Sequence, residues 1–243
     1  MKIEGCVALV TGANRGLGRA YVAALIAAGA ARVYAGTRDL SGTQSDDSRV
    51  VPVLLDVTNV SDVDSVAKAC GDVNILINNA GIMLGKSILA SNSEEAMRQE
   101  FEVNVFGVLR MSRVFAPVLA KNGGGAIVNM LSVVSWFVLP FNATYCTSKH
   151  AALAVTDGLR IELKGQGTRV VGVYAGFIDT DMAAASTAPK TPPRQVAEAT
   201  LNGLREGIDH VLADQRAHEI QNSVRTDPEA LARQMQERWD AIK

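Results

Sequence analysis

Short apolar runs recur along the chain, separated for the most part by longer segments with helical patterning. These runs lack the alternation of a half-exposed strand, as expected where helices cover both faces of a parallel sheet. We therefore predict strands at Val7–Thr11, Arg32–Thr37, Val50–Asp56, Ile75–Asn79, Ala126–Leu131 and Arg169–Tyr174, with a weaker strand at His210–Ala213.

The segments between the strands are predicted to be helices, so strand and helix alternate along nearly the whole chain. They are Leu17–Ala28, Val60–Ala69, Ser93–Ala120, Ala143–Lys164, Pro193–Glu206 and Pro228–Ala241. This order is typical of an α/β fold with a doubly wound, Rossmann-like sheet of about seven parallel strands. We expect residues 1–243 to form one dinucleotide-binding and catalytic domain, because α/β chains of this length commonly fold around one sheet.

Two segments interrupt the alternation of strand and helix. Asp39–Arg49 is polar and is predicted to be a loop, where a crossover helix would normally connect the second and third strands. Ala183–Pro193 combines small residues with prolines, which is typical of a mobile loop. We interpret residues 181–195 as a substrate loop inserted in the domain.

Composition and charge exclude several classes of protein. Hydrophobic residues make up 48% of the chain and charged residues 20%, which is ordinary for a globular protein with a buried core and excludes disorder. The formal charge of −1 supplies no field for collecting a polyanion. We therefore expect neither nucleic acid nor an anionic membrane as a partner.

The start of the chain and its cysteines bear on location. A strand pattern begins close to Met1, without the features of a secretory signal, and no apolar run reaches the roughly 20 residues needed to cross a bilayer. Cys6, Cys70 and Cys146 have no metal-ligand spacing, so no metal site is predicted and the thiols are expected to stay reduced. These features favour a cytoplasmic protein.

A glycine-rich turn follows the first strand and leads directly into an apolar helix. Such glycines let the backbone approach a pyrophosphate, while the helix N-terminus offers N–H groups to the anion. A plain glycine turn without a ligand is the alternative interpretation, because the spacing differs from the simplest fingerprint. The predicted dinucleotide contacts here are Gly12, Asn14, Arg15, Gly16, Leu17 and Gly18.

The end of the second strand indicates which dinucleotide binds. NAD enzymes usually place a carboxylate there, whereas the sequence has neutral Thr37 followed by Arg38. A guanidinium suits a 2′-phosphate, and Arg15 supplies a second cation. Both arginines have the alternative interpretation of surface charges, and Asp39 partly offsets Arg38. The pattern favours NADP(H).

Two further strand ends carry candidate cofactor contacts. Asp56, with Val57 beside it, follows the third strand, where its carboxylate would accept a hydrogen bond from an adenine amino group or cap the next helix. Asn79, Ala80 and Gly81 follow the fourth strand, where small residues allow a ribose to lie close. Structural support is an equally good interpretation of both.

Tyr145 and Lys149 are four residues apart in a predicted helix and therefore share one of its faces. A nearby ammonium group stabilises a phenolate and lowers the pKa of the phenol. Ser132 lies at the carboxyl end of the fifth strand, where α/β sheets place ligands, and would hold a substrate oxygen. Ser135 is interpreted as a turn residue, and Asn104, in an apolar helix, as either a buried functional amide or a core amide.

Taken together, TGANRGLG at Thr11–Gly18, NNAG at Asn78–Gly81, Asn104, Ser132 and YCTSK at Tyr145–Lys149 resemble the classical short-chain dehydrogenase/reductase family. The resemblance covers almost the entire chain. It implies a Rossmann-like fold, a homo-oligomer (tetramer or dimer), and a catalytic tetrad of Asn104, Ser132, Tyr145 and Lys149.

The resemblance also implies a role for each residue. Tyr145 would protonate the carbonyl oxygen that Ser132 holds, and Lys149 would lower the pKa of Tyr145 and bind the nicotinamide ribose. Asn104 would hold a water molecule connecting Lys149 to solvent. The stretch Ala175–Thr180 is similar to the segment of the family that contacts the nicotinamide, which adds Gly176, Ile178 and Thr180 to the predicted cofactor contacts.

The sequence departs from the family pattern at two places near the site. Ala175 replaces the usual proline before the nicotinamide contacts, and Phe141 stands where glycine is common and would narrow the pocket. Apolar side chains around Ser132 and Tyr145 predict a hydrophobic substrate pocket. Its predicted members are Ser132, Trp136, Phe141, Tyr145, Phe177 and Met182.

Three functions are consistent with this pattern. The favoured one is an oxidoreductase that moves hydride between NADP(H) and a carbonyl/alcohol pair, on a hydrophobic ketone or aldehyde. The second is a 3-oxoacyl-acyl-carrier-protein reductase, whose acidic partner would need a basic surface; Arg110, Arg113, Lys190 and Arg194 are candidates. The third is an NADP(H)-binding redox sensor without turnover, which the filled catalytic positions disfavour.

Overall fold

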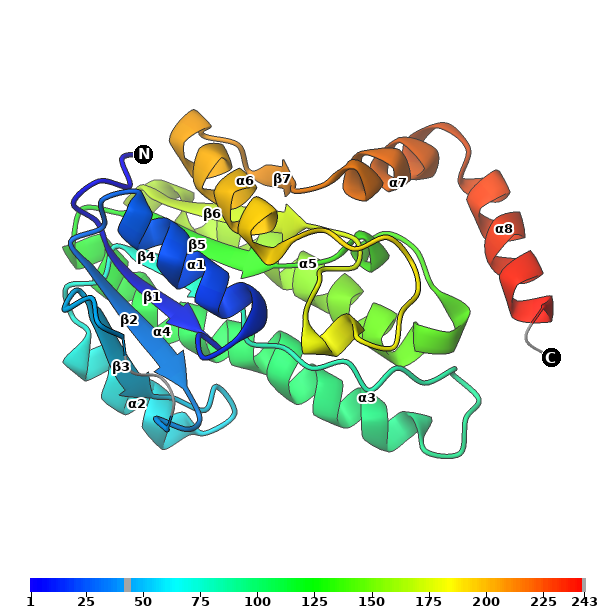
Figure 1. Ribbon diagram of the computed structural model, residues 1–243, viewed down its shortest axis with the longest axis horizontal. Coiled ribbons are helices and arrows are strands. Elements are labelled where there is room, and N and C mark those ends of the chain that lie inside the picture. The colour runs from blue at the N-terminus through cyan, green and yellow to red at the C-terminus, as the bar shows by residue number, and fades with distance from the viewer. Residues whose placement is uncertain (42–44, 242–243) are drawn as a thin grey trace.

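A single parallel sheet organises the part of the chain that the computed structural model describes, residues 1–41 and 45–241 (Figure 1). Its seven strands follow the order β3-β2-β1-β4-β5-β6-β7. They are β1 (Val7–Thr11), β2 (Arg32–Thr37), β3 (Val50–Leu54), β4 (Ile75–Asn78), β5 (Gly125–Met130), β6 (Thr168–Tyr174) and β7 (His210–Leu212). The doubly wound fold predicted from the sequence is confirmed.

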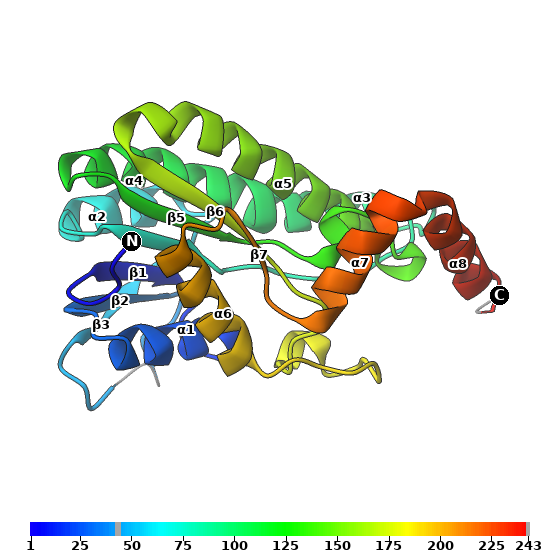
Figure 2. The ribbon, with the colours of Figure 1, turned by 90° about the horizontal axis from the view of Figure 1, so that it is seen from above.

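Helices cover both faces of the sheet, as Figure 2 shows. One layer contains α1 and α6, and the other contains α2, α4 and α5. The helices are α1 (Gly16–Ala27), α2 (Val60–Ala69), α3 (Ser93–Phe101), α4 (Val108–Lys121), α5 (Ala143–Leu163), α6 (Pro193–Glu206), α7 (Gln215–Thr226) and α8 (Pro228–Asp240). The last two extend beyond the carboxyl ends of the strands (Figures 1 and 2).

The hydrophobic core has one half on each face. On the side of α1 and α6, Tyr21, Leu25 and Leu204 are fully buried against strand residues. On the opposite side, Met111 and Phe115 of α4 are equally buried. Continuous burial on both faces explains why the strands read as unbroken apolar runs.

Two helical features differ from the sequence prediction. The predicted helix Ser93–Ala120 contains a π-helical segment, Glu102–Gly107, between α3 and α4. Helix α7 was not predicted, because only Ala217 and Ile220 of its residues are buried and the apolar stripe is too thin to recognise. The predicted loop Asp39–Arg49 is without a helix over residues 39–41 and 45–49, and residues 42–44 lie outside the described part.

The long helical segment Ser93–Lys121 is apolar as well as long. An 18-residue window in it has a mean hydropathy of 1.4, so length and composition alone would allow it to cross a membrane. This differs from the expectation that no segment would qualify. In the structure, 44% of that window is buried inside the protein, which is how a core helix with one face against a sheet behaves.

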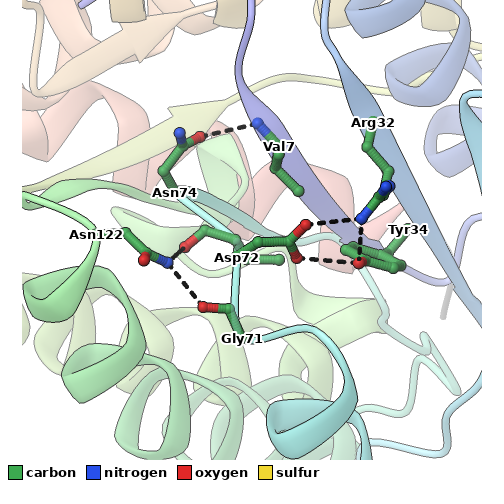
Figure 3. Close-up of polar contacts among 8 residues, drawn as sticks. Val7, Arg32, Tyr34, Gly71, Asp72, Asn74 and Asn122 are labelled. Carbon is green, nitrogen blue, oxygen red and sulfur yellow. Dashed lines mark hydrogen bonds and ion pairs between the residues drawn. The ribbon is translucent and has the colours of Figure 1, made fainter.

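Polar side chains fasten the turn before β4 to its neighbours at the amino ends of the strands (Figure 3). Asp72 accepts hydrogen bonds from Arg32 Nη1 at 2.8 Å and from the Tyr34 hydroxyl at 2.9 Å. Asn74 Oδ1 accepts one from the β1 backbone, and Asn122 Nδ2 donates to the carbonyls of Gly71 and Val73. At this end of the sheet, these polar side chains therefore serve to hold the strands and turns together.

The strand order reverses between β1 and β4. The chain moves outward from β1 to β2 and β3, then returns to place β4 on the other side of β1. In open α/β sheets a ligand binds at such a switch point, in the crevice outside the carboxyl ends of the strands. Thr11 and Asn78 end the two strands that flank it.

Candidate active site

A cavity of about 430 Å³ lies outside the carboxyl ends of the strands, at the predicted crevice. The glycine turn lines one part, Ser132 and Tyr145 another, and the segment after β6 a third. Every predicted cofactor residue lines it: Gly12, Asn14, Arg15, Gly16, Leu17, Gly18, Thr37, Arg38, Asp56, Val57, Asn79, Ala80, Gly81, Tyr145, Lys149, Gly176, Ile178 and Thr180. The cavity therefore brings together predicted cofactor residues from the ends of five strands, β1, β2, β3, β4 and β6, and from α5.

The glycine turn forms a cradle that larger residues would fill. Gly12 and Gly16 have φ angles of +65° and +51°, which side chains disfavour. A Cβ on Gly18 would lie 2.0 Å from the Gly12 carbonyl oxygen. Helix α1 starts beside this cradle without a side-chain cap on its N-terminal N–H groups. Such a concave turn with free donors fits a pyrophosphate.

Asn79 and Thr11 hold the turn in place. The Asn79 side-chain amide donates to the carbonyls of Thr11 at 2.9 Å and Gly12 at 3.3 Å. In return, Thr11 Oγ1 accepts from the backbone N–H groups of Asn79 and Ala80 at 3.0 and 2.9 Å. The asparagine thus supports the cradle from behind, which agrees with the structural interpretation of this motif.

Residues at the ends of β2 and β3 shape the side of the cavity near Arg38. Thr37 is buried, and its hydroxyl donates to the Asp39 carbonyl at 2.9 Å. Asp56 Oδ1 accepts from the Thr58 N–H at 2.9 Å and hydroxyl at 2.7 Å, ahead of α2. Asp56 therefore orders the turn that leads into α2, in addition to lining the cavity.

Arg15 forms an ion pair across the cavity rim. Its Nη1 lies 2.7 Å from Asp181 Oδ2, and the two side chains are 69% and 76% exposed. A pair this exposed contributes little stability, so it can exchange for another anion at small cost. The contact joins the glycine turn to the start of the predicted substrate loop.

Tyr145 and Lys149 lie one turn apart on α5, facing the cavity. Lys149 Nζ donates to the Met130 carbonyl at 2.8 Å and lies 5.6 Å from the centroid of the Tyr145 ring. Ser132 follows β5, and its hydroxyl accepts from the Val134 N–H at 3.3 Å. Ser135 is buried and its hydroxyl accepts from the Ser132 N–H, which makes it a turn residue as predicted.

Burial controls the protonation of the Tyr145–Lys149 pair. Desolvation lowers the pKa of Lys149 to about 8, and it raises the pKa of Tyr145, with smaller contributions from Cys146 and Glu100. The net direction at Tyr145 is opposite to that expected from its neighbouring ammonium group. The reason is that removal from water disfavours the phenolate.

Asn104 lies in the π-helical segment, behind the cavity wall, and does not line it. Its Oδ1 accepts from the Ile82 N–H at 2.9 Å, while Nδ2 donates to the Ile82 carbonyl and to Ser148 Oγ at 2.9 and 3.0 Å. The side chain thus joins the segment after β4 to α5. Its predicted role toward a water molecule stays a prediction.

Glu100 is a functional-region residue that the sequence did not reveal. Its side chain is fully buried, and Oε1 accepts from the backbone N–H groups of Leu84 and Gly85 at 2.7 and 3.1 Å. The carboxylate therefore fixes the turn that follows the Met83 wall of the cavity. A glutamate in a polar helix gives no sequence signal for such a contact.

Asp214 fastens the segment after β6. Its Oδ2 accepts from the Gly176 N–H at 2.8 Å and from the Thr191 hydroxyl at 3.0 Å, and its Oδ1 caps α7 through the Ala217 N–H. Backbone bonds join Thr191 to Phe177 and to Asp179, so the predicted substrate loop closes at a fixed neck.

The predicted substrate-pocket residues divide into two groups. Ser132, Tyr145, Phe177 and Met182 line the cavity. Trp136 and Phe141 are not among its lining residues: the Trp136 ring stacks on Tyr174 at 4.1 Å between centroids, and the Phe141 side chain is 40% exposed. Phe137, Leu139 and Met83 line the cavity instead, because Trp136 packs against the hydrophobic cluster that contains Tyr174.

Comparisons with known proteins agree with this architecture. Residues 6–191 match the sequence profile of the family described as short chain dehydrogenase. The 3-oxoacyl-acyl-carrier-protein reductase of Vibrio cholerae is 33% identical over 220 residues, which cover 82% of this chain and 89% of that protein.

Two solved structures are also similar. A short chain dehydrogenase from Burkholderia cenocepacia in complex with NADP shares 43% identity at a TM-score of 0.93, covering 97% of this chain and 99% of the other. A 3-ketoacyl-(acyl-carrier-protein) reductase from Brucella melitensis complexed with NADH shares 27% at a TM-score of 0.79, covering 87% and 95%.

The parallel sheet, the glycine cradle and the matched profile define one class of protein. The chain belongs to the short-chain dehydrogenase family, and it is an oxidoreductase of that family. The cofactor class predicted from the sequence, a nicotinamide dinucleotide, agrees with the neighbours solved with NADP and NADH.

Proposed function

We propose that this protein is an NADP(H)-dependent oxidoreductase that interconverts a hydrophobic ketone or aldehyde and its alcohol. The observation that carries the proposal is the gathering of Ser132, Tyr145 and Lys149 in the same cavity as the glycine cradle. Apolar side chains, including Phe177 and Met182, line the wall next to them. Residues 1–243 would act as one catalytic unit, with residues 181–195 as its substrate loop.

The chain's own residues supply the binding and proton-transfer groups. The nicotinamide ring, when bound, supplies or accepts the hydride. Ser132 donates a hydrogen bond to the carbonyl oxygen, and Tyr145 gives that oxygen its proton. The raised pKa of Tyr145 keeps the phenol protonated and ready to donate at neutral pH. Lys149 holds a ribose hydroxyl and replaces the phenol proton after each turnover.

The preference for NADP(H) rests on the end of β2. Thr37 is neutral and buried, and Arg38 follows it at the cavity wall. A carboxylate at this point would repel a 2′-phosphate, whereas a guanidinium binds it in a bidentate manner. Arg15, held only by its exposed pair with Asp181, supplies a second positive charge.

A 3-oxoacyl-acyl-carrier-protein reductase is the second candidate. The relatives from Vibrio cholerae and Brucella melitensis, which carry that description, support it. The four candidate docking cations give it limited support, because two of them already have acidic partners: Arg110 pairs with Glu102 at 2.6 Å and Arg194 with Glu198 at 2.6 Å. An acidic carrier would have to displace both partners.

We also propose that the protein is cytoplasmic and forms a homo-oligomer, a tetramer or dimer. Leu109 of α4 and Ile161 of the neighbouring helix α5 are 41% and 78% exposed, and Phe106, in the π-helical segment before α4, is 45% exposed. Exposed apolar side chains on adjacent helices favour a contact between subunits.

The first experiment compares Tyr145→Phe with Tyr34→Phe, which loses the same hydroxyl at the opposite end of the sheet. Rates would be measured with NADPH and NADH on aryl ketones, diketones and a 3-oxoacyl thioester. We expect Tyr145→Phe to lower kcat by about 100-fold or more, without weakening NADPH binding, because only the proton donor is lost. Tyr34→Phe should retain the wild-type rate.

Each alternative has its own signature in this experiment. A preference for NADH would contradict the assignment of Arg15 and Arg38. Tight NADPH binding without turnover of any compound would favour the redox sensor, and a large advantage for the thioester would favour the second candidate.

A further inference from the structure

Two arginines that the sequence analysis did not single out line the active-site cavity. Arg216 comes from the first turn of α7 and Arg238 from the last turn of α8. We call them the mouth arginines, because α7 and α8, which extend beyond the strand ends (Figures 1 and 2), bring them to the cavity lining. Neither is explained by the chemistry described above.

Arg238 reaches the cavity from the edge of the buried face of α8. Leu231, Met235 and Arg238 are spaced four and three apart, so they share one face of α8. The first two are buried at 7% exposure against the body of the protein. Trp239, four residues after Met235, continues the apolar packing, whereas Arg238 is exposed beside this face and lines the cavity.

Arg238 also differs from most helical arginines of this protein in its pairing. Helix surfaces pair Arg98 with Glu94, Arg194 with Glu198 and Arg233 with Glu229, each at a spacing of four residues. The equivalent position for Arg238 is Gln234, and Arg238 forms no ion pair with any residue of the described ranges 1–41 and 45–241. Its charge is available to a ligand.

Arg216 interacts unfavourably with the dipole of its own helix. A cation in the first turn opposes the positive end of the helix dipole, so α7 itself does not favour it. Its stem lies over Gly176, where an added Cβ would be 3.1 Å from both Arg216 Cβ and Cγ. Glu219 is its nearest acid, at 3.5 Å, a loose contact between half-exposed groups.

These arginines are separated from the proposed 2′-phosphate site. Arg38 follows β2, whereas Arg216 packs on Gly176 after β6, and β1, β4 and β5 lie between. Four strand spacings of about 4.8 Å correspond to ~19 Å across the sheet. The mouth arginines therefore belong to the substrate half of the cavity.

The acidic residues of the cavity do not neutralise them. Asp39 binds the backbone and hydroxyl of Ser41, Asp56 binds Thr58, and Asp181 pairs with Arg15. The same cavity lining includes the apolar side chains of Phe137, Phe177 and Met182. The substrate half thus combines an apolar wall with two cations at its outer end.

We propose that the substrate carries an anionic group remote from its carbonyl, which the mouth arginines bind. The reacting carbonyl would lie at Ser132 and Tyr145, and the apolar wall would contact the part between. A carboxylate of an oxo acid or a phosphate of a thioester carrier supplies such a group, and both form charge-assisted hydrogen bonds with guanidinium. This inference rests on the proposed function and specifies its substrate class.

The test measures kcat/KM with NADPH for 4-benzoylbutyrate, its methyl ester and acetoacetyl-coenzyme A. Arg238→Gln and Arg216→Gln are compared with Arg233→Gln, which removes the same charge from the outer face of α8. We expect wild type to prefer an anionic compound over the ester. Arg238→Gln should lower kcat/KM for that compound about tenfold, mainly through KM, and leave the ester unchanged.

The outcomes separate the inference from the function on which it rests. A fall in kcat/KM for 4-benzoylbutyrate alone indicates a carboxylate site. A fall in kcat/KM for acetoacetyl-coenzyme A alone indicates a phosphate site. An unchanged ratio of anionic to neutral substrates in both variants overturns the anion site and leaves the reductase intact. Weaker NADPH binding by Arg238→Gln, measured by fluorescence titration, would mean that Arg238 binds the cofactor. This result would also overturn the anion site. Absence of turnover for every compound overturns both.

Discussion

Lys149 shows how a residue with a proposed catalytic role can oppose folding. Its side chain is 6% exposed, and burial lowers its pKa from 10.5 to about 8. At pH 7 the lysine is protonated in both the folded and the unfolded chain, so the folded protein bears the full penalty of a buried charge. The proposed function accounts for this penalty, because it requires a cation beside Tyr145.

Replacement of Lys149 should therefore separate stability from activity. Lys149→Met is expected to raise the free energy of unfolding by roughly 3 kcal/mol at pH 7, the equivalent of the pKa shift, while turnover is lost. Between pH 8 and 10.4 the unfolded chain binds more protons, so wild type should gain stability relative to the variant. Urea unfolding across this pH range measures the difference.

An exposed lysine provides the control for this measurement. Lys164, just after α5, is exposed, and Lys164→Met should leave the pH dependence of unfolding as it is in wild type. A stability of Lys149→Met that falls below wild type at pH 7 would contradict the argument, because it would mean that the Met130 hydrogen bond outweighs desolvation.

At the scale of residues, the sequence was informative where a motif fixes a backbone position. The hydrophobic pattern locates strand ends and helix faces. Ser132 and the glycines lie at strand ends, and Tyr145 and Lys149 share one helix face, so their positions could be predicted. The sequence pattern does not predict how a side chain is oriented in an irregular turn. Trp136 was placed in the substrate pocket incorrectly, because its stacking on Tyr174 depends on packing between elements. Arg238 was missed because its inward direction is set by how α8 docks.

At the scale of elements, the glycine turn is sensitive to a single methyl group. A Cβ at Gly18 would overlap the Gly12 carbonyl, at 2.0 Å, and approach the Asn79 amide at 2.8 Å. We expect Gly18→Ala to lower the free energy of unfolding by about 1–3 kcal/mol, because the first turn of α1 must shift. NADPH affinity should fall by about tenfold or more, as measured by fluorescence titration.

The matched control is Gly71→Ala. A Cβ at Gly71 would meet nothing nearer than the Lys68 carbonyl at 3.9 Å, and this glycine has no positive φ. Reduced freedom of the unfolded chain should leave its stability unchanged or slightly higher. Equal effects of the two substitutions would show that the close approach at Gly18 is unimportant.

The strands were predictable because their burial on both faces leaves a simple signal. All seven were placed within two residues, including β7, which has only three. Helix α7 and the π-helical break gave no such signal: α7 buries little, and the break depends on the Asn104 hydrogen bonds to Ile82 and Ser148. Contacts between distant segments decide these details.

At the scale of the whole molecule, the outer sides of α4 and α5 should bury apolar side chains in an oligomer. Ile161 is 78% exposed, so a charge there costs the monomer little but would lie within the subunit contact. We expect Ile161→Glu to reduce the mass measured by light scattering after size-exclusion chromatography, while the monomer keeps its fold.

Leu89 provides a control for this substitution. It is 96% exposed but lies in the segment before α3, away from Ile161 on α5. Leu89→Glu should retain the mass of wild type. A mass that neither substitution changes would place the subunit contact elsewhere or indicate a monomer.

The fixed neck of the loop after β6 has a consequence for how such proteins diversify. Thr191 is joined to Phe177, Asp179 and Asp214, so both ends of the segment are anchored independently of what lies between them. The closure entropy of a loop grows only slowly with its length. Insertions and deletions between residues 180 and 190 can therefore accumulate over generations without displacing the residues at the strand ends. The same fold can acquire a new substrate selectivity when this loop alone changes.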